Sequence, residues 1–162
     1  MIAQLAAPAS ALRAHEEIFA YWASRRRGGR LPSRADIHPD HIKRYLPTVS
    51  LIDVSREPLD FRQRLAGTGL YGVYGREVTG MKLEEVYAQE AADYWRRELT
   101  SIVEMRRPGV GSHTMAWRGA GHLSMLWLRL PLASDGYEVD MILGYDAVLG
   151  LQNLPPSGIR AA

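Results

Sequence analysis

The stretch FRQRLAGTGLYGVYGREVTG, from Phe61 to Gly80, decides the fold of this chain. It begins with alternating polar and apolar residues, a period-two pattern that predicts a β-strand. The alternation stops at Gly67 and gives way to turns punctuated by glycine. A strand that leads into a series of short helical turns predicts a curved sheet closed over by small helices, an arrangement that forms a pocket.

The glycines of this stretch also match a nucleotide-binding motif, because Gly67, Gly69 and Gly72 have the spacing G-x-G-x-x-G after a strand. That motif binds a dinucleotide only where its third glycine lies in the helix of a parallel β-α-β unit. Here Gly75 follows three residues later and a further turn follows at Gly80, so no such unit is predicted. The glycines are instead expected to permit tight turns with positive φ angles.

The segment before this stretch predicts one long helix, a connector and two strands. The helix is expected from Ser10 to Arg27. Its buried stripe has steps of three and four residues and consists of Leu12, His15, Ile18, Phe19 and Trp22. A proline-bracketed connector follows, with a short helix at residues 40–46. Strands are predicted at residues 48–54 and 59–66, joined by the turn SREP.

The segment after the glycine-rich stretch predicts a long helix followed by three strands. A short helical turn at residues 82–87 precedes the long helix at residues 89–106. The predicted buried face of this helix consists of Ala91, Ala92, Trp95, Leu99, Ile102 and Val103. The strands, separated by the hairpin turns RGAG and ASDG, are expected at residues 110–117, 122–132 and 137–145. Residues 154–162 are expected to form a frayed tail.

This order of two strands, short helices, one long helix and three strands resembles the PAS domain family. The resemblance is most specific in LPSRADIHPDHIKRYLPTVSLIDV at residues 31–54, in the stretch 61–80 and in the helix LEEVY that follows. It is closest to the small alphaproteobacterial branch of that family. It implies an α+β fold, in which a five-stranded antiparallel sheet carries short helices and one long helix on its concave face.

The resemblance also implies a division of the chain and a class of function. The PAS-like domain would cover residues 31–147, after an N-terminal amphipathic helix within residues 1–30 that caps the sheet or dimerises, and before a tail at residues 148–162. The implied function is sensing or protein association. PAS folds accommodate haem, flavin, small metabolites or nothing, so the resemblance supplies no ligand, and the sequence itself requires no cofactor.

Composition narrows the class of protein further. The chain has 162 residues and 46% hydrophobic content, enough for one domain that buries about two-thirds of its unfolded surface. It has no cysteine, which excludes disulfides, thiolate metal sites and cysteine nucleophiles. Neither a signal peptide nor an apolar run of about 20 residues that could span a membrane is recognisable. A cytoplasmic protein is therefore expected.

The net charge of +2 is unevenly distributed, because residues 1–47 carry eight Lys or Arg against four acidic residues. Five of these cations form a cluster: Arg25, Arg26, Arg27, Arg30 and Arg34. Such a cluster suits a nucleic-acid backbone, an anionic membrane or an acidic partner protein. The simpler interpretation, preferred here, is that cations at the last turn of a helix interact favourably with the helix dipole.

The five histidines do not form a recognisable metal site, because zinc requires three or four convergent ligands. A structural role is therefore favoured for most of them. His113 differs from the others because of its place in a predicted hairpin. If Gly119 and Ala120 form a two-residue turn, His113 lies opposite Leu126 on the side of the sheet that we expect to be concave.

This register predicts two surfaces. The concave side would hold a ligand among Gln63, Tyr71, Tyr74, Trp95, His113, Met115 and Trp117. The polar members of this set would orient the ligand within an apolar lining. The opposite side is too apolar to face water and is expected to form an interface, either within the chain or with a second subunit. That interface would contain Ile18, Phe19, Trp22, Met125 and Trp127.

Three classes of function are compatible with these patterns. We favour a stand-alone sensory or protein-interaction module in bacterial signalling, in which a ligand shifts the population of a state that a protein partner prefers. The first alternative is a small acid–base enzyme, for which only His113 with Asp140 or Asp53 is available. The second is nucleic-acid binding through the basic cluster, which the acidic body of the chain disfavours. The sequence identifies neither the ligand nor the partner.

Overall fold

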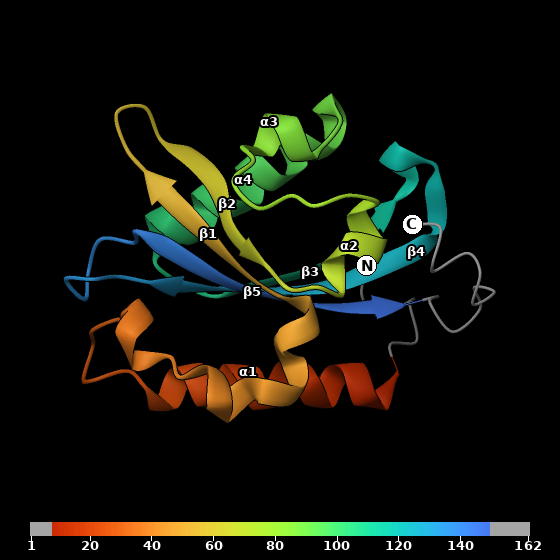
Figure 1. Ribbon diagram of the computed structural model, residues 1–162. Coiled ribbons are helices and arrows are strands. Elements are labelled where there is room, and N and C mark those ends of the chain that lie inside the picture. Colours follow the sequence, from red (N-terminus) through yellow and green to blue (C-terminus); the bar gives the residue numbers. More distant parts are fainter. Residues whose placement is uncertain (1–7, 150–162) are drawn as a thin grey trace.

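The computed structural model describes residues 8–149, which fold around a five-stranded antiparallel sheet (Figure 1). The strands are β1 (Val49–Ser55), β2 (Asp60–Ala66), β3 (Gly109–Met115), β4 (Ala120–Leu132) and β5 (Met141–Leu149). Their order across the sheet is β2-β1-β5-β4-β3, so the last strand in sequence lies at the centre. The tail that the sequence predicts at residues 154–162 lies outside the described residues.

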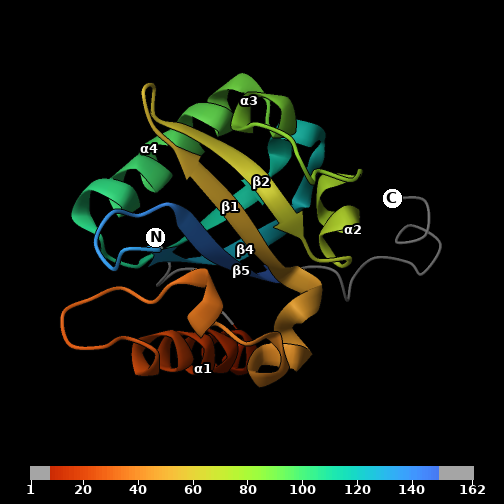
Figure 2. The same ribbon diagram turned by 60° about the vertical axis from the view of Figure 1, so that its left-hand side comes forward.

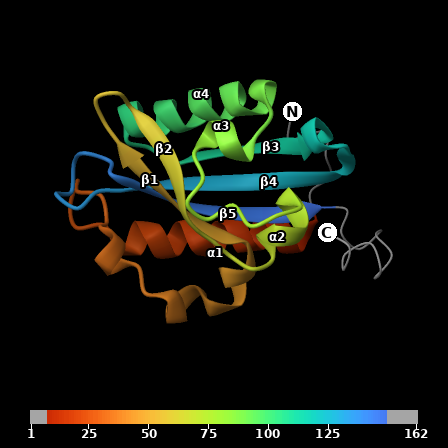
Figure 3. The same ribbon diagram turned by 45° about the horizontal axis from the view of Figure 1, so that its top comes forward.

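Helices cover both faces of the sheet (Figures 1 and 2). The outer face carries α1 (Ala9–Ser24) and the 3₁₀ segments η2 (Arg34–Asp36) and η3 (Pro39–Thr48). The concave face carries α2 (Leu70–Tyr74), α3 (Leu83–Val86) and α4 (Gln89–Met105). Figure 3 shows α1 and α4 on opposite sides of the sheet. This arrangement confirms the α+β architecture predicted from the sequence.

The predicted core face of α4 is confirmed. All six of its predicted positions are buried: Ala91, Ala92, Trp95, Leu99, Ile102 and Val103. The prediction succeeds because a helix of about 3.6 residues per turn places residues at steps of three and four on one side. Trp95 is the largest side chain of this face, and its ring lies 5.1 Å from that of Trp127 on β4. The concave face of the sheet is therefore the face that carries Trp127.

Helix α1 packs on the outer face of the sheet within its own chain. The imidazole Nε2 of His15 lies 2.8 Å from the carbonyl oxygen of Leu126, and the indole N–H of Trp22 donates to the carbonyl of Pro131 at 2.9 Å. Ile18 is fully buried between these two contacts. Of the two predicted alternatives, packing within the chain or against a second subunit, the structure shows the first. Two members of the predicted stripe are exposed instead, Leu12 at 45% and Phe19 at 44%.

The predicted register of the β3–β4 hairpin is wrong by one residue. His113 pairs with Met125 rather than with Leu126, because the 3₁₀ turn η4 (Ala116–Arg118) separates the two strands and Met115 pairs with Ala120. A shift of one residue exchanges the two faces of a strand. Met125 and Trp127 therefore lie on the concave face, beneath α4.

The predicted interface of Ile18, Phe19 and Trp22 with Met125 and Trp127 is wrong for the same reason. The two sets of side chains lie on opposite faces of the sheet, since Trp22 contacts Pro131 on the outer face and Trp127 contacts Trp95 of α4.

The glycine-rich stretch forms turns, as the sequence predicts. Helix α2 ends at Gly75, which has φ 77°, and Gly80 has φ 87°, both in the left-handed region that favours glycine. Gly67 lies against the backbone of Pro47, where a side chain would not fit. Within residues 8–149, no helix is long and apolar enough to cross a membrane. The cytoplasmic location stays a prediction.

Candidate functional site

A buried ion pair lies at the centre of the concave face. Arg129 on β4 and Asp146 on β5 are 1% and 0% exposed, and their closest charged atoms are 3.0 Å apart. The guanidinium donates a second hydrogen bond to the other carboxylate oxygen at 3.3 Å. It also donates to the backbone carbonyls of Leu128 and Tyr145. A charge in the core is costly unless it is paired in this way, so the pair is the most demanding feature of the interior.

The sheet makes room for this pair with glycine. A Cβ atom at Gly144 would lie 2.5 Å from the hydroxyl of Ser50 and 3.1 Å from the guanidinium carbon of Arg129. A Cβ atom at Gly111 would lie 2.5 Å from the indole of Trp127. Glycine at these two strand positions therefore lets large side chains lie flat against the concave face.

Aromatic rings enclose the ion pair. The guanidinium of Arg129 lies 4.7 Å from the ring centroid of Trp95, a distance typical of a cation–π contact. The rings of Trp95 and Trp127 are 5.1 Å apart, and the indole N–H of Trp127 donates to the hydroxyl of Tyr94 at 3.0 Å. The ring of Tyr87 stacks on Trp95 at 5.9 Å. These contacts fix the charged group between the sheet and α4.

A pair of tyrosines supplies neutral hydroxyls beside the charges. The hydroxyl oxygens of Tyr74 and Tyr87 are 2.9 Å apart. Burial raises the pKa of Tyr74 to about 12 and raises the pKa of Tyr87 well above its usual value. Both phenols are therefore protonated at neutral pH and act as hydrogen-bond donors or acceptors without a charge.

The charge of Arg129 is maintained despite its burial. Burial lowers the pKa of an arginine, but the charge of the Asp146 carboxylate and its hydrogen bond raise the pKa of Arg129 above its ordinary value. The group is therefore a permanent cation within an aromatic enclosure.

Several buried polar atoms of this core have no hydrogen-bond partner among residues 8–149. They are the hydroxyl of Ser50, Oε1 of Gln63, the indole nitrogens of Trp95 and Trp117, Nε2 of His113 and Nε of Arg129. An unsatisfied buried group costs about 1–3 kcal/mol, so such atoms are rare in a finished core. Their concentration on one face of the sheet marks that face as a candidate binding site.

The structure brings most of the sequence-predicted site residues to this core. Gln63, Tyr74, Trp95 and Met115 are buried. The half-buried His113 stacks on Tyr94 with 4.7 Å between ring centroids. Burial lowers the pKa of His113, which favours its neutral form.

Two further predicted site residues differ in their position. The ring of Trp117 meets Tyr87 edge to face at 5.3 Å, at the edge of the same aromatic group. Tyr71, in contrast, is 49% exposed and does not belong to the core. Tyr71 lies on the solvent side of α2, whereas Tyr74 lies on the buried side.

Sequence reasoning missed Arg129 and Asp146, although a signal was present. Arg129 is the one charge in the strand segment LSMLWLRLPL, and Asp146 is the one charge in MILGYDAVL. Charged residues are almost never fully buried unless they are paired. A lone charge of each sign in two neighbouring apolar strands therefore predicts a buried pair. The predicted register puts Arg129, two residues after Trp127, on the outer face and away from the expected pocket.

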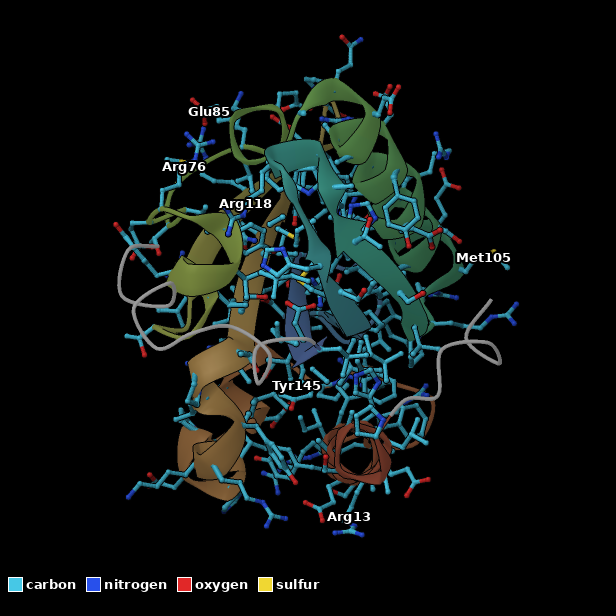
Figure 4. The ribbon with its side chains drawn as sticks, turned by 90° about the vertical axis from the view of Figure 1, so that its right-hand side faces the viewer. Arg13, Arg76, Glu85, Met105, Arg118 and Tyr145 are labelled. Carbon is cyan, nitrogen blue, oxygen red and sulfur yellow. The ribbon has the colours of Figure 1, made fainter. Side chains whose placement is uncertain are left out.

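Arg118 closes one end of the concave side. Its guanidinium donates to the backbone carbonyls of Val73 at 2.6 Å and Gly72 at 3.0 Å, which ties η4 to α2 (Figure 4). Arg76 contacts the backbone carbonyl of Glu85 and so links the segment after α2 to α3. Figure 4 shows Tyr145 on the other side of the sheet, toward α1, where its ring meets that of His15 at 5.6 Å.

The residues of this core do not fit a large planar cofactor. The ring centroids of Trp127 and Tyr87 both lie less than 6 Å from that of Trp95. Arg129 fills the space between Trp95 and the sheet. We therefore assign neither haem nor flavin to it. In the part of the chain that the structure describes, no three His, Asp or Glu side chains are placed to hold a metal ion.

The two carboxylates that the acid–base enzyme alternative requires are engaged with other partners. Asp53 forms an ion pair with Arg64 at 3.4 Å. Asp140 accepts hydrogen bonds from the backbone and the hydroxyl of Ser134. Neither carboxylate is hydrogen-bonded to His113, whose Nε2 has no partner among the described residues.

Comparison with known proteins identifies the family. The profile of the PAS domain family matches residues 11–146, which is most of the chain. The chain therefore belongs to the PAS domain family, a class of sensory modules. The match begins inside α1, and the division of the chain at residues 30 and 147 stays a prediction. A search of curated proteins returns no significant match.

Solved structures agree with this fold. The PAS domain of a protein from Colwellia psychrerythraea is 15% identical, with a TM-score of 0.51 over 68% of this chain and 95% of that chain. The d2 variant of RsLOV is 15% identical, with a TM-score of 0.50 over 86% of this chain and 68% of that chain. At these identities the likeness concerns the fold alone.

Proposed function

We propose that this PAS domain is a sensory module whose signal is a small polar molecule bound in the concave core, beside Arg129 and Asp146. One observation carries the proposal: buried hydrogen-bonding atoms on this face lack protein partners among the described residues. A ligand that supplied those partners would recover part of the free energy that each unsatisfied atom costs.

The unpartnered atoms specify the chemistry of the ligand. The indole N–H of Trp95 and the Nε–H of Arg129 are donors, so they require acceptor oxygens or nitrogens on the ligand. Oε1 of Gln63 is an acceptor, and the hydroxyl of Ser50 serves in both roles. Because Asp146 neutralises Arg129, an uncharged or zwitterionic molecule with both donors and acceptors matches the core best.

The ligand must also be small. The core above Gly144 is closely packed, since even a Cβ atom there would lie 2.5 Å from the hydroxyl of Ser50 and 3.1 Å from the guanidinium carbon of Arg129. A ligand must therefore displace side chains to enter, and only a small one can do so. A small amide or an amino acid has the required size and the required mixture of donors and acceptors.

The output of the module is a contact with another protein. A ligand that binds one state of the domain more tightly raises the population of that state, and a partner that prefers the same state then binds more tightly. Leu12 and Phe19 support such a contact, since both are exposed and lie about two turns apart on α1. The partner on this surface is a signalling protein or a second copy of the chain.

Native mass spectrometry of the purified protein tests the ligand. We expect a population heavier than the polypeptide, and we expect the excess mass to disappear on denaturation. The variants Ser50→Ala and Trp95→Phe, which each remove one polar atom of the core, should reduce the heavier population. Ser101→Ala removes a hydroxyl from an exposed position of α4 and should leave it unchanged. A single species at the mass of the polypeptide would argue against a resident ligand.

A further inference from the structure

The arginine cluster lies after the last turn of α1 rather than within it. Helix α1 ends at Ser24, Arg25 is its C-cap and the last turn contains no basic residue. The predicted position of the cluster in the last helical turn is therefore wrong, because the helix ends before its first arginine. The arginines instead lie in the loop that leads from α1 to η2, where another reason for their concentration is required.

Three of these arginines line one hollow on the surface. The hollow has a volume of about 170 Å³. Its walls come from the loop after α1, from η2 and from the turn between β4 and β5. The lining residues are Arg25, Arg27, Arg30, Leu31, Ser33, Asp36, Ala133, Ser134 and Gly136. A hollow of this size admits a small polar group and is below the range of pockets that hold drug-sized molecules.

The walls of the hollow are fixed by backbone hydrogen bonds. The N–H of Leu31 donates to the carbonyl of Gly136 at 2.9 Å, and the N–H of Ala133 donates to the carbonyl of Pro32 at 2.9 Å. Two segments about one hundred residues apart in sequence are thus held together. A site whose walls are already in place costs less conformational entropy on binding.

The guanidinium of Arg30 is also held in position. It donates to the carbonyl of Asp135 at 2.6 Å and lies 5.3 Å from the ring centroid of Tyr137. A Cβ atom at Gly136 would lie 2.6 Å from Nε of Arg30, so glycine is required for this placement. Arg25 is similarly anchored, since its Nε donates to the carbonyl of Asp36 at 2.8 Å.

The charge of the hollow is positive. Its lining carries three guanidinium groups and one carboxylate, that of Asp36. Hydrogen bonds from the backbone and hydroxyl of Ser33 lower the pKa of Asp36, so the carboxylate is ionised at neutral pH. The same bonds, at 2.9 and 3.0 Å, occupy its Oδ2. Three positive charges and one negative charge leave two positive charges in the hollow.

We propose that this hollow binds the phosphate group of a small phosphomonoester. A phosphomonoester carries about two negative charges at neutral pH and presents three acceptor oxygens, which match the surplus charge and the several guanidinium donors. Arginine is suited to this role because its planar fork donates two parallel hydrogen bonds to phosphate. Arg27 is the most accessible of the three, since its side chain is 82% exposed and lies 4.0 Å from Asp36.

The site has a consequence for signalling. A phosphate held by Arg25, Arg27 and Arg30 would join the end of α1 to the turn between β4 and β5. Both lie at the same end of the contact between α1 and the sheet, where Trp22 donates to the carbonyl of Pro131. Binding at this hollow would therefore stabilise the position of α1 independently of any ligand in the concave core.

Titration of the protein with ribose 5-phosphate, followed by amide NMR shifts at low ionic strength, tests the proposal. We expect saturable shifts at Ser33, Ala133, Ser134 and Gly136. Arg27→Gln should weaken the affinity about tenfold, the loss expected for one charged hydrogen bond. Arg13→Gln is the matched control, because Arg13 points away from the protein on the far side of α1 (Figure 4) and should leave the affinity unchanged. Ribose itself should not bind.

Three results would overturn the proposal. The first is the absence of saturable shifts in the wild-type protein, and the second is an equal loss of affinity in Arg27→Gln and Arg13→Gln, which would indicate general charge attraction. The third is tight binding of short single-stranded DNA or of phosphatidic acid vesicles that ribose 5-phosphate does not displace. A thermal melt of Arg27→Gln that matches the wild type would exclude loss of folding as the cause.

Discussion

The two faces of the sheet are both covered by helices, but they differ in how their polar groups are satisfied. On the outer face, the ring nitrogen of His15 and the indole N–H of Trp22 each reach a backbone carbonyl of β4. On the concave face, the indole N–H of Trp95 and the hydroxyl of Ser50 find no partner among residues 8–149. The buried polar groups of α1 on the outer face are therefore paired, whereas the concave face has hydrogen-bonding capacity that another molecule can use.

The largest effect is expected from breaking the ion pair of the concave face. Arg129→Met leaves the carboxylate of Asp146 buried without its partner and should lower the free energy of unfolding by about 3–5 kcal/mol. Urea denaturation at neutral pH measures this loss. The double variant Arg129→Met, Asp146→Leu should recover much of it, because no isolated charge remains. A single variant as stable as the wild type would show that the pair does not lie in the core.

The second largest effect is expected from a side chain at Gly144, where the core is closely packed. Gly144→Ala places a methyl group 2.5 Å from the hydroxyl of Ser50 and should destabilise the protein by about 1–3 kcal/mol, as overpacked cores do. Gly72→Ala is the matched control, because no atom of residues 8–149 lies within 4 Å of a Cβ atom there and α2 is helical. Thermal unfolding of both variants gives the comparison. Equal melting temperatures would contradict the close packing of Ser50 and Arg129 over Gly144.

Phenylalanine variants of two tryptophans, one on each face of the sheet, allow the two faces to be compared directly. Trp22→Phe removes a hydrogen bond and leaves the carbonyl of Pro131 unsatisfied, whereas Trp95→Phe removes an N–H that has no partner among the described residues. Both variants lose similar ring volume. We therefore expect Trp22→Phe to be less stable than Trp95→Phe by about 1–2 kcal/mol in protein freed of ligand. Chemical denaturation after refolding measures the difference. The reverse order would mean that the outer face is not the better satisfied one.

The smallest effect is the pH dependence that His15 contributes. Burial lowers the pKa of His15 from its ordinary value of 6.5, while its hydrogen bond to Leu126 opposes the shift. The unfolded chain therefore binds the proton first as the pH falls. The stability from neutral His15 is complete above about pH 6.5 and is lost as the pH falls through the pKa of the folded protein.

The variant His15→Gln isolates the contribution of His15 to the pH dependence of stability. Its melting temperature should change less than that of the wild type between about pH 7 and about pH 5. His113 titrates in the same direction, because burial also lowers its pKa. Some decline therefore remains in the variant. Identical pH profiles for the two proteins would show that His15 is not buried in its neutral form.

The sequence predicted the fold because the fold depends on strong periodic patterns. The buried face of α4 and the turns around Gly75 and Gly80 follow from helical periodicity and from the conformational freedom of glycine. The faces of β4 depend instead on a single residue in the hairpin. The turn η4 is short and its sequence resembles an ordinary two-residue hairpin, so local patterns did not reveal it.

The candidate site was predicted in part for the same reasons. Gln63, Tyr74 and Trp95 were placed correctly because their own elements were assigned correctly. The predicted register puts Arg129 on the wrong face with the rest of β4, away from its partner Asp146. A pairing between strands is a long-range property, and only the fold brings the two charges together.

A high-resolution crystal structure of the protein as purified tests the central claim most directly. The account predicts a bound small molecule in the concave core, with atoms within hydrogen-bond distance of the Nε of Arg129 and the indole nitrogen of Trp95. A core in which these two nitrogens meet only water or other protein groups would contradict it.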